Sequence, residues 1–289
     1  MIANLTKAAA VLAFPLIAHP TLAAPFCGET PRIAALTREW ADPRGPVMIA
    51  SHRGGHLKVP ENSLAAIDEA VAAGADFVEI DVQVSSDGVP FIMHDHTVDR
   101  TTNGTGKGED LTYAQLRSLR LKGADTPPPT LLEMLMHTCG RVLVDIDMKT
   151  DHIAPVLAVI QGLGMAGQIE MFDADSNLLR AARALEPDLQ VMTRLTKDAT
   201  LEGINEGLSP VRIVHGDAQS LSPKARAQIQ ALPARIWANS LGETDDLMVR
   251  SATNACAALS KLQAMGANTI QTNYPALLRG YLAKCAARN

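Results

Sequence analysis

Two polar clusters in the first third of the chain combine histidine, arginine and paired carboxylates. His52 and Arg53 follow a short apolar segment, and Glu79 and Asp81 lie within the alternating segment 77–84. Residues two apart on a strand point to the same side, so these two carboxylates should share one face. Carboxylates that close repel each other unless a cation or a shared proton lies between them. The pair therefore indicates either a metal site or, taken alone, an exposed polar face of a strand.

Three later residues have matching chemistry. His94 follows one apolar segment, and Asp147 and Lys149 lie at the end of another. Asp147 would extend the carboxylate pair to a hard oxygen ligand set suited to one divalent cation, Mg²⁺ or Ca²⁺. Lys149 and Arg53 are cations suited to a phosphate that also contacts the metal. With His52 and His94 able to take and give protons near neutral pH, the set predicts phosphodiester cleavage.

The elements that must position these residues alternate between strand-like and helix-like segments. That alternation favours one α/β domain, a (β/α)8 TIM barrel, over two doubly wound domains. In such a barrel the carboxyl ends of the strands share the face where active sites lie. Nine strand candidates are one too many, so one must be accessory or wrong. They are 47–51, 77–84, 91–93, 142–148, 169–172, 189–193, 212–215, 235–239 and 268–272.

Local signals refine this scheme. The gap between the second and third strand candidates is too short for a helical crossover, which predicts an irregularity or a missing helix there. A helix is expected over 62–73. Thr112 with Gln115 and Thr130 with Glu133 form capping boxes that should open two further helices.

The N-terminus resembles an export signal. Residues 1–23 run from a basic start through an apolar stretch to small residues, which predicts a signal peptide cleaved after Ala23. A poorly ordered N-terminal helix is the alternative. We therefore expect an exported protein, periplasmic or secreted, with one domain over 24–289. No later stretch is apolar enough for a transmembrane segment.

Composition narrows the partners. The net charge is −5 and no long basic run occurs, which disfavours nucleic-acid binding. The four cysteines form no CxxC pair, so a zinc cluster is not expected. In an exported protein they can form two disulfides in three possible pairings, or remain small buried thiols. The oligomeric state stays open. The cysteines are Cys27, Cys139, Cys256 and Cys285.

Five motifs together resemble the glycerophosphodiester phosphodiesterase family in order and spacing. A weaker likeness continues to residues 266–275. The resemblance implies a (β/α)8 barrel with a small insertion after the third strand, at about 95–129. The motifs are His52-Arg53-Gly54, Pro60-Glu61-Asn62-Ser63, Glu79-Ile80-Asp81-Val82, His94-Asp95 and Asp99-Arg100-Thr101-Thr102-Asn103-Gly104.

The resemblance also implies roles for single residues. His52 and His94 match the family's acid-base pair, and Arg53 matches a phosphate-binding residue. The metal ligands are matched by Glu79 and Asp81. Two more matches are Glu61, an acidic residue that either supports the ligands or adds one, and Trp237, a pocket-wall residue.

Two departures from the family pattern stand out. The family's Glu-x-Lys is Asp147-Met148-Lys149 here, and the related sphingomyelinase D-like phospholipases also have Asp-x-Lys at a similar position. Because the aspartate side chain is one methylene shorter than glutamate, the metal or the strand must sit closer. The usual Thr-Asp-x-Pro is Thr272-Asn273-Tyr274-Pro275, and we interpret Asn273 as a structural turn cap.

Other polar residues receive plainer interpretations. Asp145 is either a residue that supports the metal ligands without binding the ion or a polar residue that faces a helix. The remaining histidines are interpreted as packed or solvated side chains: His19, His56, His96, His137, His152 and His215.

Three functions fit these residues. The first is metal-dependent hydrolysis of a small-molecule glycerophosphodiester, such as glycerophosphocholine, to glycerol 3-phosphate and an alcohol. The second is phospholipase D-like cleavage of intact or lysophospholipids, with a cyclic phosphate as a possible product. The third is a catalytically inactive barrel that binds a phosphate ligand, which has little need for two titrating histidines.

Overall fold

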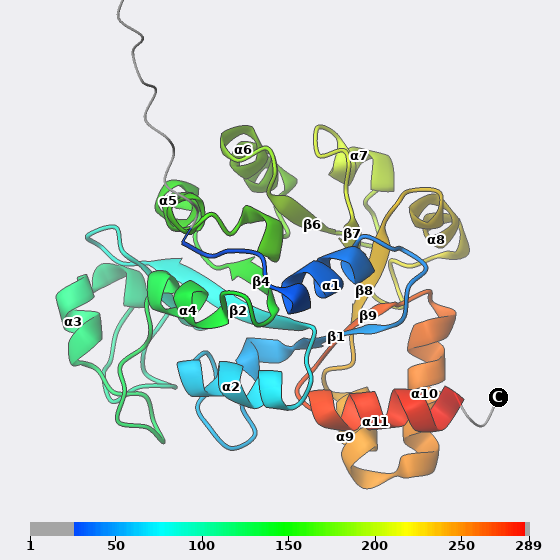
Figure 1. The fold of residues 1–289 in the computed structure, drawn as a ribbon, viewed down its shortest axis with the longest axis horizontal. Coiled ribbons are helices and arrows are strands. Elements are labelled where there is room, and N and C mark those ends of the chain that lie inside the picture. The colour runs from blue at the N-terminus through cyan, green and yellow to red at the C-terminus, as the bar shows by residue number, and fades with distance from the viewer. Residues whose placement is uncertain (1–25, 287–289) are drawn as a thin grey trace, which may run out of the picture.

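Eight parallel strands close into a barrel in the computed structural model, which describes residues 26–286 (Figure 1). Closure follows from the pairing of β1 with both β9 and β2. The predicted (β/α)8 class is therefore confirmed. The barrel strands are β1 (Met48–Ser51), β2 (Phe77–Val84), β4 (Leu143–Met148), β5 (Ile169–Asp173), β6 (Gln190–Arg194), β7 (Ile213–His215), β8 (Arg235–Asn239) and β9 (Thr269–Thr272).

The third strand candidate, 91–93, is the accessory one. β3 (Pro90–Ile92) runs antiparallel to β2, with Val82 opposite Ile92, so the short gap between them is a hairpin turn. The expected insertion follows β3 in chain order. In barrel terms it follows the second strand, because β3 is outside the barrel. The insertion carries η2 (Gly108–Asp110) and α3 (Tyr113–Ser118).

Helices ring the barrel, and both expected capping boxes are present, at Thr112 and Thr130. The helix expected over 62–73 begins later, because Asn62 has a φ of 56° and Ser63 caps the helix through Ala66. The further helices are α1 (Pro31–Trp40), α2 (Leu64–Ala72), α4 (Leu131–Thr138), α5 (Ile153–Leu163), α6 (Ser176–Leu185), α7 (Leu201–Asn205), α8 (Pro223–Gln230), α9 (Glu243–Arg250), α10 (Ala252–Ala264) and α11 (Pro275–Ala286), with the 3₁₀ turns η1 (His52–Gly54) and η3 (Ala166–Gln168).

The two faces of each strand bury different chemistry. In β2, Val78 and Ile80 pack outward into the main apolar cluster under the helices. Phe77 points inward, where it packs edge-on against Trp40 of α1 at 5.3 Å and Trp237 of β8 at 5.9 Å. This apolar layer fills the barrel near the strand starts, and α1 lies across that end (Figure 1). The inward-facing polar residues lie toward the opposite end of the barrel.

The four cysteines form two disulfides, which settles the pairing. Cys27 joins Cys139 across 112 residues, and Cys256 joins Cys285 across 29 residues. The first ties the segment before α1 to the end of α4. The second ties α10 to α11.

Removing the longer bridge is expected to cost more stability than removing the shorter one. Chain-entropy arguments give roughly 5 kcal/mol for the 112-residue separation and roughly 3.5 kcal/mol for the 29-residue separation. Urea unfolding of Cys27→Ser with Cys139→Ser, beside Cys256→Ser with Cys285→Ser, measures both losses. A loss below about 1 kcal/mol for the longer bridge would contradict the expectation.

Among the described helices, none is long and apolar enough to cross a membrane. The expected signal peptide, residues 1–23, and His19 within it lie outside the described residues.

Candidate active site

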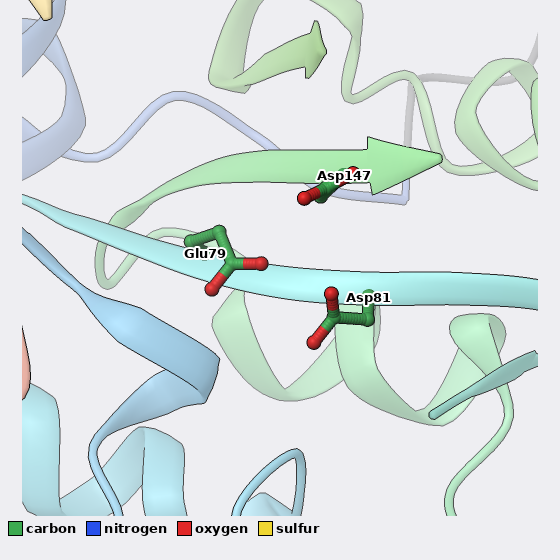
Figure 2. A group of neighbouring side chains, drawn as sticks. All are labelled: Glu79, Asp81 and Asp147. Carbon is green, nitrogen blue, oxygen red and sulfur yellow. The ribbon is translucent and has the colours of Figure 1, made fainter. Parts of the chain in front are cut away.

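Three carboxylates meet at the carboxyl ends of β2 and β4. Glu79 and Asp81 share the inner face of β2, and strand register places Asp147 beside Asp81. One oxygen from each lies within 4.8 Å of the others (Figure 2). Glu79 and Asp81 are almost fully buried. The predicted ligands are thus brought together by strand alternation and register.

The electrostatics of this group fit a bound divalent cation. Burial, together with the charges of Asp81 and Asp147, raises the pKa of Glu79 well above its usual range. Burial, aided by the charge of Asp81 and opposed by Lys149, raises the pKa of Asp147 to about 6. Such shifts mark anions that repel one another. Mg²⁺ or Ca²⁺ prefers this all-oxygen donor set and would offset the repulsion.

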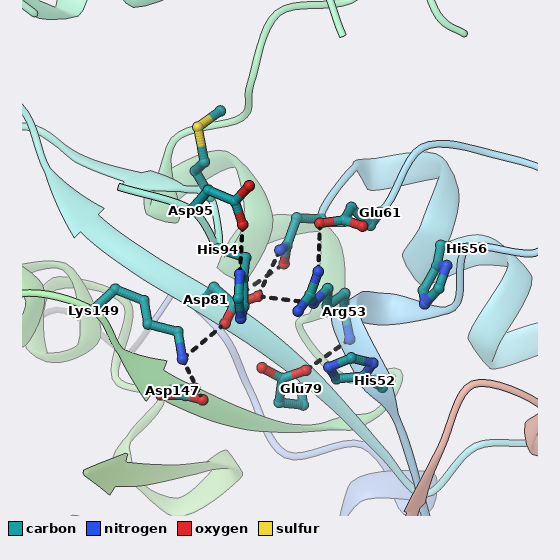
Figure 3. Close-up of polar contacts among 12 residues, drawn as sticks. His52, Arg53, His56, Glu61, Glu79, Asp81, His94, Asp95, Asp147 and Lys149 are labelled. Atoms are coloured by element: carbon teal, nitrogen blue, oxygen red, sulfur yellow. Dashed lines mark hydrogen bonds and ion pairs between the residues drawn. The ribbon is translucent and has the colours of Figure 1, made fainter. Parts of the chain in front are cut away.

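Two cations flank the carboxylates (Figure 3). The backbone N–H of Arg53 donates to Glu79 Oε2 at 2.7 Å, and its Nε lies 3.8 Å from Asp81 Oδ2. Lys149 Nζ lies 2.7 Å from Asp147 Oδ2 and 3.3 Å from Asp81 Oδ1. Arg53 and Lys149 therefore lie where the sequence predicted them, beside the ligand set.

The local backbone explains the His-Arg-Gly motif. Arg53 has a φ of 52°, in the left-handed region, and Gly54 follows with a φ of 79°. A Cβ at Gly54 would lie 2.9 Å from Ile67 Cδ1 and 3.2 Å from Ala66 Cβ. Glycine therefore allows the turn to pack against α2 while the Arg53 N–H points at Glu79.

Glu61 supports the site from behind the ligands. Its carboxylate accepts from Arg53 Nη1 at 2.8 Å and from Arg100 Nη2 at 2.7 Å. Burial alone would raise the pKa of Glu61, but the hydrogen bonds and charges of Arg100 and Arg53 lower it to about 2. It is not among the described carboxylates that can share one ion. Of the two predicted roles, the supporting one fits.

Asn62 is a partner that the sequence analysis did not single out. Its Nδ2 donates to Asp81 Oδ2 at 2.7 Å, and its Oδ1 accepts from the Asp81 backbone N–H at 3.3 Å. The amide therefore fixes the orientation of one carboxylate. The residue lies inside the Pro60–Ser63 motif, which was the only available signal.

His52 is held by a neutral partner. Its Nδ1 lies 2.8 Å from Asn273 Oδ1, which also lies 2.9 Å from His56 Nε2. Because an amide oxygen only accepts, His52 Nδ1 carries a proton and Nε2 keeps its lone pair. Burial lowers the pKa of His52 to about 4, although the Asn273 bond opposes the shift.

Asn273 is itself anchored. Its backbone N–H donates to Asp245 Oδ2 at 2.8 Å, and Asp245 also accepts from Thr272 Oγ1. The interpretation of Asn273 as a turn cap missed its side-chain contacts with His52 and His56. His56, interpreted as packed or solvated, is half-buried and contacts this amide.

His94 reaches the site through the β2–β3 hairpin. The Met93 N–H donates to Asp81 O at 2.9 Å, and Gln83 Nε2 donates to the carbonyls of Met93 and Asp95. Unlike His52, His94 has a carboxylate partner, with Nδ1 2.7 Å from Asp95 Oδ1.

That partner belongs to a longer chain of charges. Arg100 bridges Asp95 and Glu61, with Nε 2.6 Å from Asp95 Oδ2. The hydrogen bond from Arg100 holds the pKa of Asp95 well below its usual range. The contacts Arg53–Glu61–Arg100–Asp95–His94 therefore link the cation beside the ligands to the second histidine. Figure 3 shows the first and the last of these contacts.

One cavity joins these groups at the carboxyl ends of the strands. Trp237 lines it as predicted; its Nε1 donates to Asn239, and its ring packs on the apolar layer. Both histidines and all three ligands share its wall. The full lining is His52, Glu79, Asp81, His94, Asp145, Asp147, Phe172, Met192, Arg194, His215, Trp237, Asn239, Leu241 and Gln271.

A second carboxylate row lies beneath the ligands. Asp145 is in register with Glu79 on one side and Glu170 on the other, and all three are buried. Burial raises the pKa of Asp145 and of Glu170 well above their usual ranges. Asp145 lines the cavity, so the supporting interpretation fits and the helix-facing one is wrong. Glu170 was missed.

The remaining histidines divide between surface and cavity. His96 and His152 are exposed, and His137 pairs with Asp68 at 2.9 Å. His215 is packed as expected, with 5% of its surface exposed, but it also lines the cavity.

Replacing Asn273 tests its contact with His52. Asn273→Ala should lower kcat/KM for the predicted phosphodiester cleavage by about 10- to 100-fold, because the His52 imidazole loses the acceptor that orients it. Asn273→Asp should raise the pKa of His52, because a carboxylate favours the imidazolium, and should move the acidic limb of the pH–rate profile to higher pH. A pH profile of kcat/KM for both variants measures this. An Ala variant with unchanged activity would show that the contact has no role.

The comparisons with known proteins agree with this geometry. Residues 52–162 match the model of the glycerophosphoryl diester phosphodiesterase family. Glycerophosphodiester phosphodiesterase 1 of Rattus norvegicus is 45% identical over 116 residues, which are 37% of this chain and 35% of that protein. The glycerophosphodiester phosphodiesterase of Caldanaerobacter subterraneus is 39% identical over 110 residues, 36% of this chain and 45% of that protein. The chain thus spans less than half the length of these relatives.

Solved structures extend the likeness to most of the barrel. The glycerophosphodiester phosphodiesterase of Agrobacterium tumefaciens is 26% identical with a TM-score of 0.68, covering 80% of this chain and 98% of that one. A phosphodiesterase of Oleispira antarctica, solved with sn-glycerol-3-phosphate, has a TM-score of 0.70 at 22% identity and covers 82% and 97%.

Fold and site together define an α/β barrel with a carboxylate and histidine centre at the carboxyl ends of its strands. Through residues 52–162, the chain is similar to the glycerophosphoryl diester phosphodiesterase family.

Proposed function

We propose that this protein is a metal-dependent phosphodiesterase that hydrolyses glycerophosphodiesters to glycerol 3-phosphate and an alcohol. One observation carries the proposal: a single cavity joins two histidines with different partners to a cation-flanked carboxylate group. The family match and the names of the relatives support the substrate class.

The ligand set would consist of Glu79, Asp81 and Asp147, which suit Mg²⁺ or Ca²⁺. When bound, the ion supplies positive charge against the non-bridging oxygens of the phosphate. Arg53 and Lys149 add fixed positive charge beside it, and the guanidinium can bind phosphate oxygens in a bidentate way. Trp237 closes the wall against which the substrate lies.

The different partners of the two histidines support different roles for them. His52, held by the neutral Asn273 oxygen, keeps Nε2 free to accept a proton from the water whose oxygen attacks phosphorus. His94, whose Nδ1 is held by the Asp95 carboxylate, would give a proton to the departing alkoxide from its other ring nitrogen. Each proton transfer contributes roughly 10²- to 10⁴-fold.

The assay is glycerol 3-phosphate release by purified mature protein from glycerophosphocholine, glycerophosphoethanolamine and glycerophosphoglycerol. We expect release with Mg²⁺ or Ca²⁺ and none with EDTA. Release of the alcohol from lysophosphatidylcholine alone would instead establish the phospholipase D-like activity. Metal binding without turnover of any substrate would leave the inactive barrel.

We also propose export to the periplasm or beyond. The two disulfides support this, because such bonds persist in oxidising compartments. Cell fractionation with N-terminal sequencing checks it: a chain that begins at Met1 in the cytosol would end the proposal.

A further inference from the structure

The cavity is electrostatically two-sided. Its acidic residues all come from β2 and β4: Glu79, Asp81, Asp145 and Asp147. Arg194 and His215 line it from β6 and β7, on the opposite side of the closed barrel. Strand register places Arg194 beside His215 at the ends of β6 and β7, and His215 beside Trp237 of β8.

Arg194 is held in place by a neutral partner. Its Nη1 lies 3.2 Å from His215 Nδ1, and the His215 ring packs edge-on against Phe172 at 5.4 Å. An arginine can only donate, so His215 Nδ1 is the acceptor and the ring is neutral. The other guanidinium N–H groups of Arg194, a half-buried residue, remain available at the cavity wall.

The charge of Arg194 has little compensation nearby. Among the described residues, no carboxylate oxygen forms an ion pair with it, whereas Arg53 has two such partners. Asp217 is near enough for Arg194 to lower its pKa, but its carboxylate accepts from the N–H groups of Gln219 and Ser220 and lies outside the cavity lining. A guanidinium fixed in this way is suited to an anionic oxygen from a ligand.

The position of Arg194 indicates which chemical group of a ligand can lie on that side of the cavity. With the phosphate at the carboxylate group and Arg53, a substituent of the diester that crosses the cavity would reach the side lined by Arg194 and His215. A quaternary ammonium group would need an open aromatic face or a carboxylate there. Phe172 instead packs against His215, Trp237 packs against Phe77, and the lining on that side has no acid.

We propose that Arg194, oriented by His215, binds an anionic group on the alcohol portion of the substrate, so that the preferred diesters carry a carboxylate or a second phosphate there. The proposal rests on the proposed phosphodiesterase function and specifies its substrate class. Arg194 is a specificity-determining residue in this scheme and takes no part in proton transfer.

The test uses two nearly isosteric diesters of glycerol 3-phosphate, one with 3-hydroxypropionate and one with 3-hydroxypropionamide. A charge-assisted hydrogen bond predicts that kcat/KM favours the carboxylate by about 10- to 100-fold. Arg194→Met should reduce that ratio to about one, and Arg194→Lys should retain part of it. Arg250→Met, at an exposed arginine of α9, is the matched control and should keep the wild-type ratio.

Three outcomes would overturn the inference. The wild-type protein could hydrolyse both diesters with nearly equal kcat/KM. The Arg194→Met variant could keep both the wild-type activity and the preference for the carboxylate. Or kcat/KM of the variant could fall by the same factor for both diesters, which would mean that Arg194 binds the glycerol or the phosphate common to both. Thermal stabilisation of Arg194→Met by Mg²⁺ or Ca²⁺ shows that the variant is folded with its ligand set intact.

Calorimetric binding of both diesters to the His52→Ala protein separates this inference from the proposed function. Tighter binding of the carboxylate diester that depends on Arg194, without turnover by the wild-type protein, would end the phosphodiesterase function and keep the anionic ligand class. Turnover of both diesters without any difference in binding would keep the phosphodiesterase function and end the anionic ligand class.

Discussion

His52→Ala is expected to lower kcat/KM for glycerophosphodiester hydrolysis by about 10²- to 10⁴-fold, the contribution of one positioned proton-transfer group. The loss should leave metal binding intact, because the His52 ring bonds to Asn273 rather than to a ligand carboxylate. His152→Ala, an exposed histidine at the start of α5, is the matched control and should retain full activity.

The same experiment can assign base and acid. A substrate with a p-nitrophenolate leaving group needs no protonation of the departing oxygen. It should therefore restore most of the activity of His94→Ala and little of that of His52→Ala. Rescue of His52→Ala instead would reverse the two roles, and activity of His52→Ala within threefold of wild type would remove His52 from the mechanism altogether.

Much of the barrel could be predicted because period-two alternation on β2 and β4 is a strong local signal. It fixed which residues point inward, and hence that Glu79, Asp81 and Asp147 share one site. The place of β3 was ambiguous because a three-residue apolar run does not reveal the direction of the strand. Only pairing with β2 shows that β3 is antiparallel and carries His94 back to the ligands.

The residues that contact the proposed catalytic histidines, or face them across the cavity, were harder to predict. Asn273 lies 221 residues from His52, and its contact depends on β9 closing the barrel against β1. Arg194 and His215 come from strands whose ends have no distinctive local pattern. Residues that act through long-range closure carry no local signal, so they could be found only after the register was known.

The cysteines show the same limit. Their even number, together with the expected export signal, favoured two disulfides over buried thiols, but spacing alone could not choose among three pairings. The 112-residue separation of Cys27 and Cys139 is closed by the packing of the segment before α1 against α4 and α5, for example through the Cys27 N–H to Leu163 O bond of 3.1 Å.

Metal should reverse the stability ranking of wild type and Glu79→Gln. In EDTA, the buried Glu79 carboxyl has a raised pKa, so over the pH range above its ordinary value the native state binds more protons than the unfolded state. The free energy of unfolding then falls as pH rises, and this cost is absent in the glutamine variant. Glutamine can still accept the Arg53 N–H bond, so Glu79→Gln should unfold at the same temperature as wild type or higher at pH 8.

Saturating Mg²⁺ or Ca²⁺ should then stabilise the wild type by about 2.7 kcal/mol at 100 times the dissociation constant. The variant should gain far less and lose hydrolysis, because a neutral amide is a poor substitute for an anionic ligand. Glu202→Gln, an exposed residue of α7, should follow the wild type. Scanning calorimetry with EDTA and with each cation checks whether the order of the two unfolding temperatures reverses. Equal stabilisation of wild type and Glu79→Gln would place the ion outside the β2–β4 carboxylates, whereas a crossing with one cation alone would identify the ion for which this shortened Asp147 site is built.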